Sequence, residues 1–179
     1  MKRNGVANRI AQKYMNIVYP DVTADEGAAV HLEQAQSLVE RLFNKLPKKA
    51  KDILINAEYH VCLGETIGET VADDDVNPST ILGLTKPSEE IIMLNLERFK
   101  EDSPKLLTED AFENLFFHES GHYLVHHFTD EEKSVYYRYF GAEPYMVGEP
   151  EADGFAAYMK GVAPYHVQEF WSWWVLKDY

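Results

Sequence analysis

The sequence has a single cysteine, Cys62, so no disulfide can form within the chain. Such sparse cysteine usage is typical of a protein from a reducing compartment. No apolar stretch approaches the roughly 20 residues that span a membrane, and the N-terminus lacks the apolar segment of a secretory signal peptide. These absences predict a cytoplasmic protein with no membrane partner.

Positive charge is also scarce. The 17 lysines and arginines are outnumbered by 30 aspartates and glutamates, which gives a net charge of −13. Direct binding to nucleic acid is therefore not expected, because the phosphate backbone attracts basic surfaces. A hydrophobic fraction of 45% nevertheless predicts a folded chain. With no repeat or low-complexity linker, residues 1–179 are expected to form one domain, with residues 1–50 as a helical N-terminal arm and 51–179 as the core.

Apolar spacing predicts helices and one strand in the first third of the chain. Residues 10–18 suggest a short amphipathic helix that stops before Pro20. Thr23 and Glu26 have the spacing of a capping box, which would open a long helix through Leu46, and Pro47 can begin another helix. Residues 59–63 read as a strand. The loop that follows has an acidic tip at residues 73–75, which is either a calcium site or, more simply, a solvated loop.

The remaining two thirds predict a β-hairpin followed by helices. Residues 80–85 and 91–96 read as its two strands, and a helix over 109–127 is apolar on nearly every side, as a buried helix is. A second capping box at Thr129 opens a helix that Gly141 can close. Further helices begin at Pro150 and Pro164. Short strands followed by helices predict an α+β fold.

The buried helix carries the sequence HESGH at residues 118–122. Helical spacing places His118 and His122 one turn apart on the same face, so both imidazoles can reach one metal ion. Zinc suits nitrogen ligands of this kind. Glu119 points beside the metal, where it can hold a water molecule and accept its proton. The alternative is a cluster of polar core residues, but such groups are costly to bury without partners.

A third protein ligand is needed, and three acidic residues lie downstream. Glu149, Glu151 and Asp153 all belong to the segment that opens at Pro150. Each lies at the margin of the apolar face of that helix, so helical geometry alone does not choose among them.

HESGHYLVHH followed by EADGFAAYM resembles the ImmA/IrrE family of metallopeptidases. The resemblance covers about residues 80–161, and it implies a zincin-like metallopeptidase domain in which Glu151 is the third zinc ligand. Ser120 departs from the pattern, since an apolar residue is usual there. Relatives of this kind cut specific regulatory proteins such as repressors, so the resemblance implies an intracellular protein as substrate.

The broader group of lethal-factor-like zinc proteases is also similar, and it places a tyrosine shortly before the third ligand. Tyr145, six residues before Glu151, is the candidate for that role, in which its hydroxyl would stabilise the oxyanion. The alternative is an ordinary structural tyrosine.

Three other features call for simpler interpretations. His126 lies on the ligand side of the helix but further from the metal, as an outer or surface histidine would. Cys62 is best interpreted as a buried structural thiol. The tryptophan-rich C-terminal segment is expected to dock on the core, or to bind a partner if it is exposed.

The sequence therefore predicts a zinc-dependent endopeptidase in which His118 and His122 hold Zn²⁺, with Glu151 as the third ligand that the resemblance implies, and Glu119 is the general base. A substrate peptide is expected to add along residues 91–96 at a sheet edge. Two alternatives remain: a non-catalytic, zinc-stabilised interaction module, and a metal-dependent hydrolase of small amides.

Overall fold

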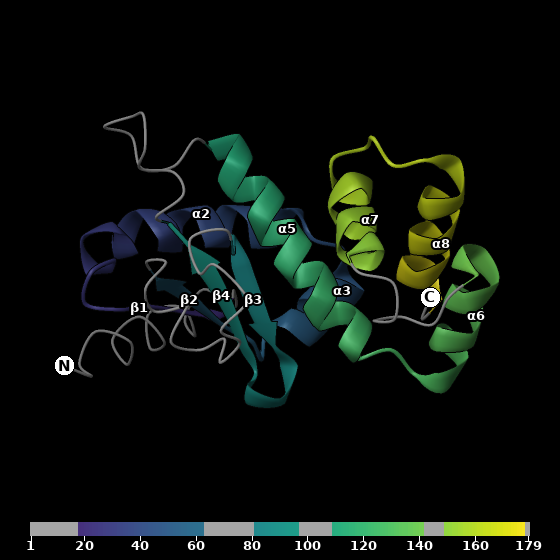
Figure 1. Ribbon diagram of the computed structural model, residues 1–179, viewed down its shortest axis with the longest axis horizontal. Helices are drawn as coiled ribbons and strands as arrows, with labels where there is room; N and C mark the ends of the chain where they lie inside the picture. The colour runs from purple at the N-terminus through teal and green to yellow at the C-terminus, as the bar shows by residue number, and fades with distance from the viewer. Residues whose placement is uncertain (1–17, 63–80, 97–108, 142–148, 178–179) are drawn as a thin grey trace.

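The computed structural model describes residues 18–62, 81–96, 109–141 and 149–177, which form a mixed α+β fold (Figure 1). Within these ranges, four short strands make one sheet in the order β1-β2-β4-β3. Their bounds are Asp21–Ala24 for β1, Glu58–Cys62 for β2, Gly83–Lys86 for β3 and Ile91–Asn95 for β4. The α-helices are α2 (Leu32–Lys45), α3 (Lys48–Leu54), α5 (Glu109–His126), α6 (Asp130–Phe140), α7 (Pro150–Met159) and α8 (Tyr165–Leu176).

The hairpin predicted before the long helix is confirmed, and it determines which strand has a free edge. β3 pairs antiparallel with β4, and the short 3-10 turn Pro87–Glu89 joins them. β4 also pairs in parallel with β2, so β4 is bonded on both sides. The prediction that a peptide adds along residues 91–96 is therefore wrong, because no free edge exists there. Among the described strands, β1 and β3 are the edges.

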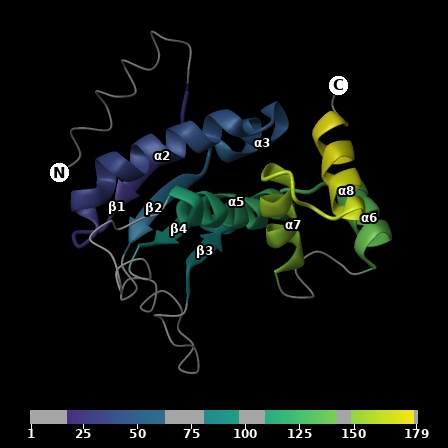
Figure 2. The ribbon, with the colours of Figure 1, turned by 90° about the horizontal axis from the view of Figure 1, so that it is seen from above.

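One face of the sheet packs into the main core, as the alternation of strand side chains requires. Tyr59 and Val61 of β2 and Ile92 and Leu94 of β4 are fully buried in a cluster with residues of α2 and α5. Cys62 and Met93 point to the other face, where they form a smaller cluster. Figure 2 shows α2 and α5 lying beside the sheet.

Residues 21–32 depart from the prediction. Thr23 does not cap a helix but belongs to β1, where its hydroxyl donates to Glu58 at 2.7 Å and lies 2.9 Å from Nδ1 of His60. The long helix begins later, at Leu32, after the 3-10 turn Ala29–His31. Residues 21–45 thus contribute a strand and a helix to the core and do not project from it as an arm.

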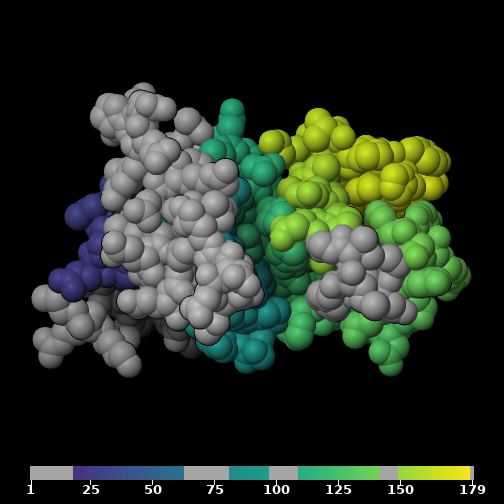
Figure 3. Space-filling view, viewed as in Figure 1, coloured from purple at the N-terminus to yellow at the C-terminus, as the bar shows by residue number. Residues whose placement is uncertain are grey.

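The remaining helices lie as the sequence predicted. α5 crosses the sheet and contacts α7 along its other side, and α6, α7 and α8 pack together at one end of the molecule, in the green and yellow region of Figures 1 and 3. Trp171 and Trp174 are completely buried, so the tryptophan-rich segment docks on the core. Of the helices in the described ranges, none has the length and apolarity to cross a membrane.

The capping box of α6 is confirmed, and it also ties α6 to α3. The Thr129 hydroxyl accepts from the Glu132 backbone N–H, and the Glu132 carboxylate accepts from the Thr129 N–H at 2.7 Å. Lys49 of α3 donates to the same carboxylate at 2.8 Å. Burial raises the pKa of Glu132, but the hydrogen bonds from Lys49 and Thr129 outweigh burial and hold the pKa below its ordinary value. Gly141 closes the helix with φ +70°.

Three predictions fall outside the described residues. They are the amphipathic helix over most of 10–18, the acidic tip at 73–75 and the role of Tyr145.

Candidate metal centre

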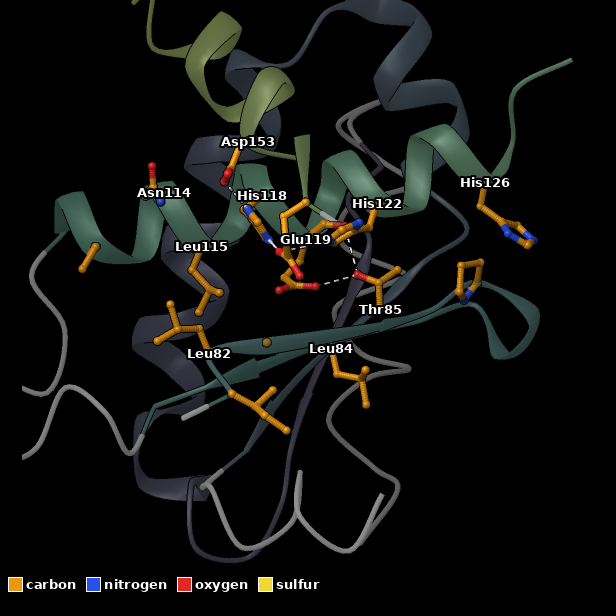
Figure 4. Close-up of a pocket in the computed structure, with 15 residues that line it drawn as sticks. Leu82, Leu84, Thr85, Asn114, Leu115, His118, Glu119, His122, His126 and Asp153 are labelled. Carbon is orange, nitrogen blue, oxygen red and sulfur yellow. Dashed lines mark hydrogen bonds and ion pairs between the residues drawn. The ribbon is translucent and has the colours of Figure 1, made fainter. Parts of the chain in front are cut away.

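The two histidines of HESGH lie side by side on α5, one turn apart, with ring centroids separated by 4.9 Å. α5 is fixed by its apolar side chains, since Phe112, Phe116 and Leu124 are fully buried. This burial leaves His118 and His122 partly exposed on the side that faces β3 and α7 (Figure 4). The sequence therefore places both imidazoles on one accessible face.

Both imidazoles present the same nitrogen to one carboxylate oxygen. Oε2 of Glu149 lies 2.6 Å from Nε2 of His118 and 3.4 Å from Nε2 of His122. Glu149 is the residue immediately before α7, and its carboxylate is largely exposed. One ligand atom from each of these three residues lies within 4.8 Å of the others, so the group could hold a metal ion.

The remaining ring nitrogens face the next two carboxylates of the same segment. Nδ1 of His118 lies 3.0 Å from Oδ1 of Asp153, which is a hydrogen-bonding distance. Nδ1 of His122 lies 3.8 Å from Oε1 of Glu151, which is too long for a direct hydrogen bond. Glu151 itself is buried. The structure thus brings Glu149 to the shared Nε2 side, and Glu151 to the opposite side of His122.

The geometry of a helical turn explains why the three carboxylates face different sides. Residues four apart in a helix point in nearly the same direction, whereas residues two apart point in nearly opposite ones. Glu149 and Asp153 are four apart and both face His118. Glu151 lies between them and turns toward the interior. The arrangement differs from the ligand that the family resemblance implies, Glu151, because the group that could hold a metal contains Glu149 instead.

Glu119 is held against β3. Its side chain is buried, and the Thr85 hydroxyl lies 2.8 Å from its Oε2 and 3.0 Å from its backbone carbonyl oxygen. Burial raises the pKa of the Glu119 carboxyl above its ordinary value, although the Thr85 hydroxyl and the two histidines act in the opposite direction. The carboxyl therefore lies beside the histidine pair in a poorly hydrated position.

Two small residues next to the histidines allow neighbouring elements to approach α5. Gly121 faces α7, and a Cβ there would lie 2.9 Å from the Cα of Ala152. Ser120 is fully buried, and its hydroxyl lies 2.9 Å from the Tyr59 hydroxyl of β2. The polar Ser120 side chain therefore has a hydrogen-bond partner in the sheet.

Substituting Gly121 with alanine should push α7 away from the histidines. The added methyl would meet backbone, which cannot rotate aside, so we expect the free energy of unfolding to fall by about 1–3 kcal/mol despite the better helix propensity of alanine. Chemical denaturation of the metal-free protein measures this. Gly154→Ala is the matched control, because its nearest neighbour is a side-chain methyl of Val167 at 3.3 Å. Equal stabilities of the two variants would contradict the close contact.

The histidines open onto a cleft of about 1010 Å³. β3, α5 and the start of α7 form its walls, and Leu82, Leu84 and Leu115 make part of it apolar (Figure 4). His126 also lines this cleft and is exposed, as predicted, but it is not a member of the metal-binding group found among the described residues. Cys62 is buried, and burial raises its thiol pKa to about 12, in agreement with a structural role.

Sequence reasoning missed Thr85 and Gly83 as partners of Glu119. Their spacing of two residues in a predicted strand would have placed them on one face, but only the strand register shows that this face meets α5. Comparisons of the chain with protein-family models, curated proteins and solved structures gave no match.

Proposed function

We propose that this protein is a zinc-dependent endopeptidase with a zincin-like catalytic domain. One observation carries the proposal: Nε2 of His118, Nε2 of His122 and a Glu149 oxygen converge at the wall of an open cleft, beside the buried carboxylate of Glu119. The resemblance of residues 80–161 to ImmA/IrrE metallopeptidases points to the same activity.

The donor set fits zinc. Atoms that share a tetrahedral zinc ion at about 2.0–2.1 Å lie roughly 3.3 Å apart. His122 Nε2 and Glu149 Oε2 are already 3.4 Å apart, whereas His118 Nε2 and Glu149 Oε2, at 2.6 Å, would have to separate to admit the ion. Both ring nitrogens of His118 face carboxylates, whereas a neutral imidazole carries one proton. If that proton is on Nδ1 and is donated to Asp153, Nε2 is free to share a cation with Glu149. His118, His122 and Glu149 would therefore hold the ion.

Zinc in such a site polarises a peptide carbonyl and lowers the pKa of a nearby water molecule. The chain supplies the rest of the chemistry. Glu119 accepts the proton of the attacking water and passes it to the leaving amine. Asp153 fixes the ring orientation of His118, as carboxylates do for metal-binding histidines.

We favour a protein segment over a small amide as the substrate. The cleft runs along β3, an edge strand that can pair with an extended peptide, and apolar side chains line part of its wall. The family resemblance suggests an intracellular regulatory protein, such as a repressor, as substrate. We accordingly place the peptide along β3.

A purely structural zinc site is the main rival. Such sites are closed by four protein ligands, whereas the group found among the described residues has three and lies at a cleft. The adjacent Glu119 also has no role in a structural site. These features support the catalytic interpretation.

Metal content tests the proposal directly. Purified protein should carry about one zinc ion per chain by elemental analysis, and zinc should return to the chelator-treated protein with a stoichiometry near one. His118→Ala and His122→Ala should each abolish this binding, while His126→Ala, on the same helix, should retain it. A wild-type protein that takes up no transition metal would contradict the proposal.

A further inference from the structure

β3 contacts the proposed general base through two residues on one face of the strand. Gly83 and Thr85 are two residues apart, so both point toward α5, and both meet the side chain of Glu119. Neither residue belongs to the histidine–carboxylate group described above.

The space above Gly83 is filled by the Glu119 side chain. A Cβ at position 83 would lie 2.4 Å from Oε1 and 2.6 Å from Cδ of Glu119, closer than any side-chain contact allows. The carboxylate therefore rests directly on the backbone of β3. Only glycine leaves room for it in this position.

The Thr85 hydroxyl holds the other carboxylate oxygen. It lies 2.8 Å from Oε2 and can donate its one proton there, which leaves Oε1 without this partner. A hydrogen bond to a buried carboxylate is stronger than one between neutral groups. α5 and β3 also pack against each other, so the Glu119 carboxylate is held between its own helix and the strand.

We infer that Thr85 is a positioning residue that orients the Glu119 carboxylate toward the cleft. Gly83 leaves the space that the carboxylate needs in this orientation. The inference rests on the proposed hydrolase function. It also gives β3 two roles: the strand that we expect to bind the substrate backbone also orients the base that acts on it. A glutamate free to rotate about its side-chain torsions would lose much of its effect, because proton transfer requires hydrogen-bond reach.

The test uses acetohydroxamate, a small zinc chelator added as its acid, whose hydroxyl proton is shared with a neighbouring carboxylate in the complex. Its dissociation constant is measured by calorimetry on zinc-loaded wild-type, Thr85→Val, Thr85→Ser and Glu119→Gln proteins, together with zinc affinity by chelator competition. Thr85→Val keeps the shape but removes the donor, so we expect acetohydroxamate to bind about tenfold more weakly, the size expected for a hydrogen bond to a charged group. Thr85→Ser should restore binding to within about threefold, and zinc affinity should stay within about threefold in all four proteins.

Each outcome points to a different conclusion. If Glu119→Gln weakens acetohydroxamate binding but Thr85→Val binds it like wild type, the positioning role is refuted and the proposed function stands. If the wild type binds neither zinc nor acetohydroxamate, the proposed function itself fails. Should Thr85→Val not fold, Gly83→Ala provides the second test, because it displaces the carboxylate from the other side. Wild-type binding of acetohydroxamate by Gly83→Ala would likewise refute the inference.

Discussion

Replacing Glu119 with glutamine should leave zinc bound and slow peptide-bond cleavage by a factor on the order of 100 to 10,000, the usual contribution of a positioned acid–base group. Glutamine keeps the size of the side chain, and its amide can still accept the hydrogen bond of Thr85. It cannot take a proton from water. The predicted loss is therefore in kcat, with a much smaller change in KM.

The measurement requires the natural substrate, which can be sought by co-expressing the protein with the products of neighbouring genes. Glu113→Gln is the matched control, because Glu113 lies on the same helix and pairs with Lys45, outside the residues that line the cleft. This variant should cleave at the wild-type rate. A Glu119→Gln protein that cuts the same substrate at the wild-type rate would exclude Glu119 as the base.

Local sequence signals predicted the helices around the site well. α5 combines a dense apolar pattern with HESGH, and Thr129 and Glu132 form the capping box that their spacing indicates. Prolines mark the starts of α7 and α8. Each of these signals acts within a few residues, so tertiary contacts do not have to be known.

The predictions that were wrong or missed depend on contacts between residues far apart in the sequence. Thr23 and Glu26 match a capping box equally well, but Thr23 pairs with β2, more than 30 residues away, and bonds to Glu58 and His60. The edge position of β3 likewise depends on the parallel pairing of β4 with β2. No pattern within a few residues of either strand indicates that pairing. The contact of Thr85 with Glu119 follows from the same sheet register.

The third ligand depends on a rotation that the sequence of α7 does not specify. Glu149, Glu151 and Asp153 are all acidic, and a turn of α7 about its axis would exchange the residues that face the histidines. Gly121 explains why α7 can lie so close to α5, because Ala152 of α7 occupies the space that a side chain at position 121 would fill. It does not determine which carboxylate faces His118.

The zinc affinities of three variants should separate these possibilities. Glu149→Gln removes the oxygen that lies nearest both Nε2 atoms, so we expect the largest loss, beyond the roughly 10- to 100-fold typical of residues that orient a ligand. Asp153→Asn should fall within that range, because its carboxylate faces Nδ1 of His118 and belongs to no metal-binding group found among the described residues. Glu151→Gln should reduce zinc affinity least, because 3.8 Å separates its oxygen from His122. Chelator competition at fixed pH gives all three values.

The order of the three losses in zinc affinity is the test, because a change in overall stability can alter the size of each loss. Denaturation of the three metal-free variants measures that change in stability separately. Glu149 and Asp153 lie on the same side of the helical turn, so the structure predicts that both variants weaken zinc binding more than the variant between them does. The opposite pattern, with Glu151→Gln losing zinc and the other two retaining it, would mean that α7 presents its other side to the histidines. The ligand implied by the family resemblance would then replace Glu149, while His118, His122 and Glu119 would keep their roles.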